Sequence, residues 1–315
     1  MVTERSGEEL KLGWIGTGRM GVQMVTRLLS GSSPVIVYNR TRAKAEPLGA
    51  LGASIADHLW ELGACDVVCV AVTSSSDLEQ VLLGPAGLLS GESRPEIIVD
   101  FSTVGADASA HVRRELAAQG VALLAAPVSG NPNVARAGKL TMAVSGPRPA
   151  FDAVSGLLAQ LGAGATYVGE GETARLVKLC HNLFLGVVTQ ALVEVTVLAE
   201  KGGVSREAFL RYLNASVLGS TFTRYKAPQL VNTDYRATFT TNLLHKDFDL
   251  GLAAARELRV PLPLASLVQQ LVMTLVSLGY GEEDFAALLE LQGRNSGLEV
   301  ASEQAEVPDG LSGSQ

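Results

Sequence analysis

A glycine-rich hexapeptide, GTGRMG at residues 16–21, follows an apolar run at residues 10–15 and opens an amphipathic segment. The pattern G-x-G-x-x-G is weak alone, but a strand before it and a helix after it are the context in which it binds a dinucleotide. Gly16 would allow the tight turn, Gly18 the close approach of a pyrophosphate, and Gly21 the packing of helix on strand. The alternative is a plain strand–turn–helix without a ligand. The motif therefore predicts a nicotinamide dinucleotide site at this end of a sheet.

The residues after the second predicted strand, residues 34–38, indicate which dinucleotide is bound. An NAD site places Asp or Glu there, about 20 residues after the glycines, to hold the ribose hydroxyls. This sequence has Asn39, Arg40 and Thr41 instead, with Arg42 and Lys44 close behind. No carboxylate at this position repels a 2′-phosphate, and a guanidinium and a hydroxyl could bind one. We predict NADP, with NAD as the alternative; otherwise these cations only begin a solvated helix.

Lys178 and Asn182 are a second candidate for chemistry, because a spacing of four places both on one face of a helix. They lie in a stretch from Gly169 to Lys201 that has no proline and, after its two opening glycines, only Gly186 to weaken a helix. As one helix it would be about 40 Å long. Alternating strands and helices precede it and only helices follow, so the stretch predicts a helix joining two domains with a polar pair at the joint.

The first 168 residues alternate apolar strands with helices. The continuous apolar run at residues 66–72 is typical of a parallel strand buried on both faces, and Cys65 and Cys69 belong to it as core residues. The loop at residues 73–77 follows its carboxyl end, the edge where open α/β sheets bind ligands. Strands are predicted at residues 10–15, 34–38, 66–72, 97–101, 121–126, 139–145 and 166–168, and helices at 107–119 and 148–161.

The remainder of the chain shows helical spacing only. Helices are predicted at residues 205–213, 221–231, 242–258, 264–278 and 283–291, with Pro261, Pro263 and Gly279 in the gaps. Residues from 297 onward are acidic and small, which predicts a disordered tail. The predicted fold is α/β: a Rossmann-type NADP-binding domain at residues 1–168, an all-α domain at 169–296, and a tail at 297–315, with a long interdomain helix joining the domains.

The amino-acid composition limits the kinds of partner that the protein could bind. The chain has 315 residues, of which 47% are hydrophobic and 18% charged, and this indicates extensive burial, including burial against another subunit. A net charge of −7 argues against a nucleic acid or an anionic membrane as partner. The four scattered histidines predict no metal site.

The predicted location is the cytoplasm. The three cysteines form no CxxC pair, which fits a reducing compartment. The N-terminal residues are charged and lack the apolar segment of a signal peptide. The longest apolar run, residues 183–199, contains Gln190 and Glu194 and is too interrupted to span a membrane.

Several blocks taken together resemble the β-hydroxyacid dehydrogenase family. They are GTGRMG after the first strand, Asp100-x-Ser102-Thr103, the segment APVSG at residues 126–130, and Lys178-x-x-x-Asn182, all in the family's order and spacing. The segment KDFDL, which begins at Lys246, is similar to the family's K-D-L block. The likeness covers about residues 10–292. Members include 3-hydroxyisobutyrate dehydrogenase, tartronate semialdehyde reductase and glyoxylate/succinic semialdehyde reductase, and imine reductases form a related branch.

The resemblance implies roles for the matched residues. Lys178 would donate a proton to the carbonyl oxygen as hydride arrives, which a lysine does only when desolvation or a nearby cation lowers its pKa toward neutrality. Asn182 would hold the substrate oxygen or carboxylate. The remaining substrate contacts would come from Ser102, Ser129, Gly130 and Asn131. The cofactor contacts would come from Gly16, Thr17, Gly18, Arg19, Met20, Gly21, Asn39, Arg40, Thr41, Val72, Thr73, Thr103 and Lys246.

For some of these residues the alternative is a purely structural role. Lys178 and Lys246 could be solvated helix lysines, and His181 is better explained by packing or hydrogen bonding than by catalysis. The family usually has Asp where this chain has Ala125, and a second glycine where it has Asn131, a residue that tolerates the left-handed conformation. Val104, Gly105 and Ala106 stand where a proline is common. These differences would surround the substrate and would affect its identity more than the reaction type.

The sequence therefore predicts an NADP-dependent oxidoreductase that interconverts a small 3-hydroxy acid and its semialdehyde or oxo acid. It would act as a homodimer or homotetramer whose long helices pack across subunits. One alternative is an imine reductase on the same scaffold, although those enzymes typically replace the lysine. Another is a non-catalytic dinucleotide-binding protein. The presence of both Lys178 and Asn182 argues against this alternative.

Overall fold

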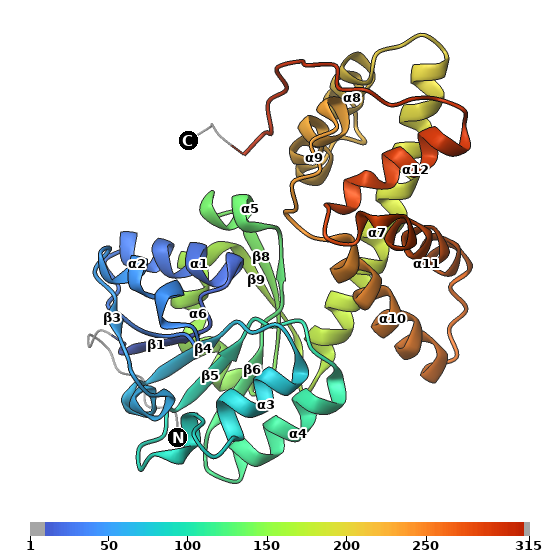
Figure 1. Ribbon diagram of the computed structural model, residues 1–315. Helices are drawn as coiled ribbons and strands as arrows, with labels where there is room; N and C mark the ends of the chain where they lie inside the picture. Colours follow the sequence, from blue (N-terminus) through green and yellow to red (C-terminus); the bar gives the residue numbers. More distant parts are fainter. Residues whose placement is uncertain (1–9, 312–315) are drawn as a thin grey trace. The chain divides into compact units, whose positions relative to one another are not determined.

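The structure is a computed structural model that describes residues 10–311. The chain divides into two compact units, residues 1–178 and residues 179–315 (Figure 1). The division falls inside one uninterrupted helix, α7 (Thr173–Lys201). The predicted long helix is thus confirmed as an element, and it contributes its first turns to one unit and the rest to the other.

The first unit is built on a single sheet with strand order β3-β2-β1-β4-β5-β6-β8-β7, with β9 beside β8. The strands from β3 to β6 in this order are parallel, β8 runs antiparallel to β6 and β7, and β9 is parallel to β8. The strands are β1 (Leu12–Ile15), β2 (Val35–Tyr38), β3 (Ser54–Ile55), β4 (Val67–Val70), β5 (Ile97–Asp100), β6 (Ala122–Ala125), β7 (Val128–Ser129), β8 (Leu140–Ser145) and β9 (Gly162–Gly169).

Helices cover both faces of this sheet, α1, α2 and α6 on one and α3 and α4 on the other (Figure 1). Because both faces are covered, every residue of β1, β4 and β5 is buried, which explains their continuous apolar sequences. Cys65 and Cys69 are buried core residues, as expected, and burial raises the pKa of the Cys65 thiol to about 11. The α-helices are α1 (Arg19–Ser30), α2 (Glu46–Gly49), α3 (Ser75–Leu83), α4 (Ala106–Ala117), α5 (Pro132–Arg136) and α6 (Arg148–Leu161).

The predicted fold class is confirmed, and the differences are local. The sequence missed β3 and β7, each of two residues, because so short a strand leaves no periodic pattern. It also missed α5 and placed the last strand at residues 166–168, whereas β9 begins at Gly162, directly after α6. Glycine and alanine fill the start of β9, so its sequence lacks the apolar signature of a strand.

The second unit is helical. Besides the rest of α7 it contains α8 (Arg206–Ala215), α9 (Thr221–Asn232), α10 (Thr241–Glu257), α11 (Pro263–Leu275) and α12 (Leu288–Asn295). A π-turn at Val276–Tyr280 and a 3-10 turn at Phe285–Ala287 connect the last helices. Its core is a cluster of leucine, valine and phenylalanine side chains from all of these helices.

Two glycines let α7 and α10 approach closely within this unit. A Cβ atom on Gly186 would lie 2.3 Å from the Phe248 ring, and one on Gly251 would lie 2.8 Å from Leu183. Each glycine therefore provides the space for a side chain of the other helix. Gly186 does not break α7, and its place in the helix is explained by packing rather than by local helix propensity.

The expectation of a disordered tail from residue 297 is wrong for the residues that the structure describes. Residues 297–311 contain no helix or strand, but they are bonded to the helical unit. Glu303 accepts hydrogen bonds from the backbone N–H groups of Arg206 and Glu207, and Asn232 bonds the backbone of Ala305 through both its amide atoms. The buried Arg206 guanidinium donates to the Ala301 carbonyl. In this tail an acidic side chain, Glu303, makes specific hydrogen bonds to the helical unit. Residues 312–315 lie outside the described part.

Two helices are long and apolar enough to cross a membrane by length and composition: α7 and the segment Pro263–Tyr280. The sequence argument that the apolar run in α7 is too interrupted therefore does not hold by this measure. Half of the most apolar window of α7 is buried inside the protein, against 22% for the second segment. The core helices of soluble proteins show the same properties, so this observation is weak evidence for a membrane.

Candidate cofactor and active site

The glycine-rich turn between β1 and α1 has the shape that pyrophosphate binding requires. Gly16 has φ 95°, and a Cβ there would lie 2.2 Å from the Ala71 carbonyl oxygen. A Cβ on Gly21 would lie 2.1 Å from the Gly16 carbonyl oxygen, so this glycine permits the helix to pack on the turn. A Cβ on Gly18 would meet nothing within 4 Å. The space over Gly18 is open, and among the described residues no side chain caps the start of α1 there.

An open helix N-terminus with free space above its glycine is a ready anion site. The residues present therefore fit the pyrophosphate of a dinucleotide. Arg19 and Met20 occupy the first turn of α1 and supply backbone N–H groups to this end. The Thr17 N–H is already used within the protein, because it donates to Asn39 Oδ1 at 2.9 Å. The Thr17 side chain is buried.

Asn39 ties the glycine-rich turn to the loop after β2. Its Oδ1 accepts from Thr17, and its Nδ2 donates to the Thr41 carbonyl at 2.9 Å. Both ends of the amide are therefore used within the protein. Asn39 shapes the loop that presents Arg40 and Thr41, both of which are exposed.

Beside this turn lies a cavity of about 490 Å³. Its lining includes most of the predicted cofactor residues of this region: Gly16, Gly18, Asn39, Arg40, Thr41, Val72 and Thr73. Lys44 also lines it. Arg42 does not, because its guanidinium pairs with Asp57 and Glu46 at the surface. Of the two further cations in the sequence, the structure brings only Lys44 to the cavity.

The cavity also contains a carboxylate that the sequence argument did not foresee. Asp77, at the start of α3, lies 3.3 Å from Arg40 Nη1, and both residues line the cavity. Ser74 caps α3 and holds this aspartate, because its hydroxyl donates to Asp77 Oδ2 at 2.8 Å. The sequence argument considered only the position after β2, where Asn39 stands in place of an acidic residue, and Asp77 comes from another loop. Asp77 is 37 residues from Arg40 in sequence, so only the fold brings the pair together.

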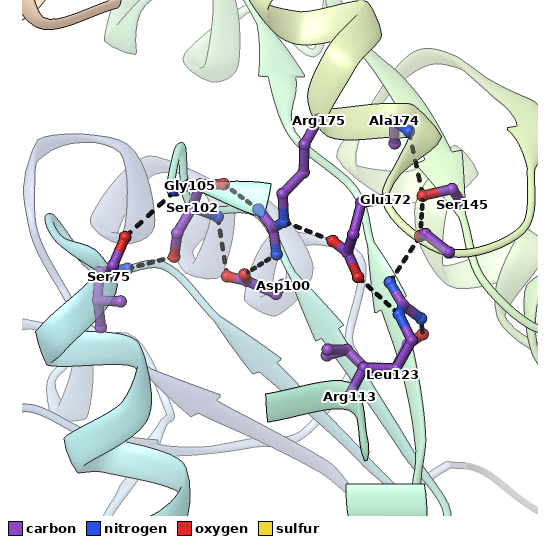
Figure 2. A network of polar contacts seen from close by, with 12 residues as sticks. Ser75, Asp100, Ser102, Gly105, Arg113, Leu123, Ser145, Glu172, Ala174 and Arg175 are labelled. Atoms are coloured by element: carbon purple, nitrogen blue, oxygen red, sulfur yellow. Dashed lines mark hydrogen bonds and ion pairs between the residues drawn. The ribbon is translucent and has the colours of Figure 1, made fainter. Parts of the chain in front are cut away.

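A buried polar network surrounds the end of β5 and the start of α7 (Figure 2). Asp100 is fully buried; its Oδ1 accepts from the Ser102 N–H at 2.9 Å and its Oδ2 from Arg175 Nη2 at 2.7 Å. Arg175 also donates to the Ser102 carbonyl at 3.0 Å and to Glu172 Oε2 at 3.0 Å. Arg113 donates to the other oxygen of Glu172 at 2.7 Å.

The network contains two arginines and two carboxylates, so its formal charges cancel. Burial raises the pKa of the Glu172 carboxyl, but the hydrogen bond from Arg113 and the charges of both arginines outweigh burial, so this pKa lies below its usual range. Glu172 thus remains ionised and holds both guanidinium groups. The sequence analysis included Asp100 only as part of a motif and did not single out Arg175 or Glu172 as a site.

The predicted substrate residues of this unit are not all exposed. Ser102 is 3% exposed, and its hydroxyl accepts the Val72 N–H at 2.9 Å, so it links the loops after β4 and β5. Thr103 and Ser129 are half-buried and Gly130 is exposed.

Asn131 takes a different conformation from the one expected. Its φ of −112° is extended rather than left-handed, and the positive φ belongs to Gly130, at 129°. The Asn131 side chain caps α5 by accepting from the N–H groups of Asn133 and Val134. The turn therefore survives because asparagine is a good N-cap. Ala125, another departure, is fully buried at the end of β6, next to Asp100 in the sheet, so it does not face solvent.

In the helical unit, the amide of Asn182 is held at both ends. Asn182 Nδ2 donates to Asp247 Oδ2 at 2.5 Å, and Asn182 Oδ1 lies 2.9 Å from His181 Nδ1. Since a carbonyl oxygen only accepts, His181 carries its proton on Nδ1 in this arrangement. Asn182 and Asp247 are both at most 2% exposed. His181 thus has a hydrogen-bonding role, as predicted, and the buried Asp247 is a partner that the sequence analysis missed.

Lys178 and Lys246 lie beside these groups in sequence. Lys178 is half-buried on α7, one turn before Asn182. Lys246 is 39% exposed on α10, with its ammonium 3.7 Å from Asp247 Oδ1. The close packing at Gly186 and Gly251 places Asp247 against α7, which explains why an asparagine and an aspartate 65 residues apart meet. Among the described residues no group of three or more histidine, cysteine or acidic side chains forms a metal site.

These features define a class of protein: a nicotinamide-dinucleotide-binding α/β unit followed by a helical unit that shares a long helix. Comparison with known families agrees. The NAD binding domain of 6-phosphogluconate dehydrogenase matches residues 11–169, and the NAD-binding domain of NADP-dependent 3-hydroxyisobutyrate dehydrogenase matches residues 169–292. The chain belongs to the β-hydroxyacid dehydrogenase family, and it is an oxidoreductase of the NAD(P)-dependent class that acts on CH–OH groups.

Individual relatives cover nearly the whole chain. It is 29% identical to 2-(hydroxymethyl)glutarate dehydrogenase of Eubacterium barkeri over 94% of this chain and 99% of that protein. Among solved structures, 3-hydroxyisobutyrate dehydrogenase from Salmonella typhimurium has a TM-score of 0.80 at 25% identity, covering 90% and 99% of the two chains. Psf3 in complex with NADP+ and 2-OPP has a TM-score of 0.79 at 27% identity, covering 89% and 99%.

Proposed function

We propose that this protein is an NADP-dependent oxidoreductase that interconverts a small 3-hydroxy acid and its semialdehyde or oxo acid. The observation that carries the proposal is the open N-terminus of α1 at Gly18, next to a cavity whose rim carries Arg40, Thr41 and Lys44. The first feature suits a pyrophosphate and the second a 2′-phosphate. The relatives named as hydroxyacid dehydrogenases support the substrate class.

The reaction class assigns distinct tasks to the residues of α7. The nicotinamide, when bound, supplies hydride to a carbonyl carbon or accepts it from an alcohol carbon. In the reducing direction Lys178 donates a proton to the carbonyl oxygen, so that aldehyde, hydride and proton give the alcohol and a neutral lysine remains. In the oxidising direction the same amine accepts the hydroxyl proton.

Asn182 serves this chemistry as a hydrogen-bond donor. With one N–H given to Asp247 and its carbonyl facing His181, its amide has one N–H left to offer. That N–H would hold the substrate oxygen or carboxylate one turn from Lys178. Because Asp247 accepts from Nδ2, it fixes the Asn182 amide so that the nitrogen, rather than the oxygen, would face the substrate. We propose the substrate contacts of the first unit at Ser102, Ser129, Gly130 and Asn131, and further cofactor contacts at Thr103 and Lys246.

The remaining parts of the proposal concern location and assembly. The acidic charge of −7 and the absence of a cysteine pair fit a cytoplasmic enzyme with small-molecule substrates, without nucleic acid or membrane as partner. The exposed apolar residues of the helical unit fit a homodimer or homotetramer.

The test is the oxidation of NADPH or NADH, followed by the loss of reduced-nicotinamide absorbance. Glyoxylate, succinic semialdehyde and related aldehyde acids form one set of substrates, and a cyclic imine forms a second. We expect turnover of an aldehyde acid with NADPH, and a loss of at least about 100-fold in kcat for Lys178→Ala with NADPH binding retained. Near-normal kcat in that variant would refute the role of Lys178.

The other results of this test each select an alternative. Turnover of the imine alone would indicate an imine reductase and remove Lys178 from the mechanism as written. NADPH binding without turnover of any substrate in either set would indicate a protein that binds the dinucleotide without this reaction. Conversion of the parent hydroxy acids with NADP+ would confirm the reverse direction in the same experiment.

A further inference from the structure

Arg175 lies three residues before Lys178, on the same side of the first turns of α7. We propose that Arg175 is a positioning residue, which fastens this part of α7 to the loop after β5 and thereby fixes where the Lys178 ammonium can reach. The inference rests on the proposed function, since it assigns Arg175 a task in the chemistry of Lys178. Nothing in the sequence pattern distinguishes Arg175 from a solvated helix-start arginine.

All three nitrogens of the Arg175 guanidinium donate hydrogen bonds. Its Nη2 donates to Asp100, its Nη1 to the Ser102 carbonyl and its Nε to Glu172, at 2.7, 3.0 and 3.0 Å (Figure 2). Arg175 is 2% exposed and Asp100 fully buried, so water does not compete for these bonds. A planar fork with several bonds fixes direction as well as distance. The start of α7 therefore cannot rotate or slide without breaking several bonds at once.

The same bonds continue to the cofactor cavity. Asp100 receives the Ser102 N–H while Arg175 holds the Ser102 carbonyl, so both sides of this residue's backbone are fixed. The Ser102 hydroxyl in turn accepts the Val72 N–H, and Val72 lines the cavity. A continuous set of hydrogen bonds thus runs from the helix turn of Lys178 to the wall of the proposed dinucleotide site.

A purely stabilising role explains this arrangement less well. Buried ion pairs contribute little to stability compared with well-packed apolar residues, because desolvation offsets the attraction between the charges. What a hydrogen-bonded buried arginine supplies reliably is a fixed geometry. An error of about 1 Å in the place of a reacting group can cost about 100-fold in rate. Holding a proton donor at a set distance from the cofactor wall is a task of that kind.

The matched control is Arg206, a buried arginine of the helical unit. It is fully buried and, like Arg175, bonds a carboxylate, Glu200, and the backbone carbonyls of Val231 and Ala301. It has no contact with Lys178, Asp100 or Ser102 among its described bonds. Arg206→Lys therefore reproduces the loss of a buried guanidinium without altering the start of α7.

The experiment compares wild type, Arg175→Lys, Asp100→Asn and Arg206→Lys in thermal unfolding, NADPH affinity and the pH profile of kcat. We expect Arg175→Lys and Asp100→Asn to lower kcat by about 10- to 100-fold and to move the limb of the pH profile that depends on Lys178. KM and NADPH affinity should change by less than about threefold. Arg206→Lys should lower the Tm and leave both kcat and the profile as in wild type. Equal kcat values in all folded variants would overturn the proposal.

A second readout does not require turnover. Reductive methylation with ¹³C-formaldehyde labels the lysines, and the Lys178 signal is the one missing from Lys178→Ala. We expect Arg175→Lys and Asp100→Asn, but not Arg206→Lys, to shift that signal and its titration. A wild type without turnover, but with this shift in the variants, would refute the proposed reaction and leave the positioning inference standing. An unchanged Lys178 signal would refute the positioning inference even in an active enzyme.

Discussion

At the scale of single residues, an ion pair beside the proposed cofactor cavity determines how a 2′-phosphate could bind there. Arg40 is a cation that a 2′-phosphate could use, but in the structure its guanidinium already pairs with Asp77. The pair is exposed on the arginine side, where the charge attraction is weak and screened by salt. A phosphate with two negative charges would therefore compete successfully for Arg40, with Lys44 on the same rim.

This pair gives a prediction on cofactor preference. Arg40→Ala should weaken NADPH binding much more than NADH binding, since only the former carries the 2′-phosphate. Asp77→Asn should act in the opposite direction and strengthen NADPH binding by a few-fold, because it frees Arg40 and removes a repelling carboxylate. Titration of nicotinamide fluorescence measures the affinities of wild type and both variants for NADPH and NADH. Equal losses for NADPH and NADH in Arg40→Ala would mean that Arg40 does not bind the 2′-phosphate.

At the scale of elements, α7 and α10 meet through glycine. The Gly186 position accepts the edge of the Phe248 ring, and the Gly251 position accepts Leu183, so the two helices lie closer than larger residues would permit. This contact places Asp247 within hydrogen-bond distance of Asn182. The distance between two helix backbones thus determines whether the Asn182 amide is oriented.

Gly186→Ala tests this dependence. Although alanine favours a helix by about 1 kcal/mol over glycine, its methyl group would collide with Phe248, and such overpacking costs about 1–3 kcal/mol. We expect a lower midpoint of thermal unfolding and a raised KM for the aldehyde acid, with NADPH affinity nearly unchanged. Gly156→Ala on α6 is the control, because a Cβ there meets nothing within 4 Å. A Gly186→Ala protein more stable than wild type would contradict the packing argument.

At the scale of the whole molecule, the helical unit presents apolar side chains to solvent. Leu264, Leu267 and Met273 of α11 are 66%, 61% and 45% exposed, and Leu278 beyond it is 41% exposed. Scattered apolar residues are normal, but a helix that is apolar on its outer face indicates an interaction surface. We propose a second copy of the chain as the partner of this face, in line with the predicted homodimer or homotetramer.

We therefore expect the purified protein to have at least twice the 32.9 kDa mass of one chain in size-exclusion chromatography with light scattering. Leu267→Glu should shift it toward the monomer, because a charge buried in an apolar interface is costly. Glu115→Leu, on the surface of α4, should not alter the mass. A wild type that is monomeric at micromolar concentration would refute the assembly proposal.

The sequence alone determined those features that depend on neighbours along the chain. Residues 16–21 follow a buried strand and precede a helix, so their glycines carried enough local information to predict the turn. The continuous apolar runs predicted a sheet covered on both faces, and the proline-free stretch from Glu172 predicted the long helix. The family resemblance rested on the same local blocks, in their order.

The tertiary structure decided which distant polar groups meet. The pairs Arg175–Asp100, Asn182–Asp247 and Arg40–Asp77 join residues 75, 65 and 37 positions apart. The tail after residue 297 is held by Arg206 and Asn232 for the same reason, although its composition predicts disorder. Hydrophobic periodicity records which face of an element is buried, but it contains nothing about which charge on another element will stand opposite. Such pairs follow from strand order and helix packing, which only the folded chain establishes.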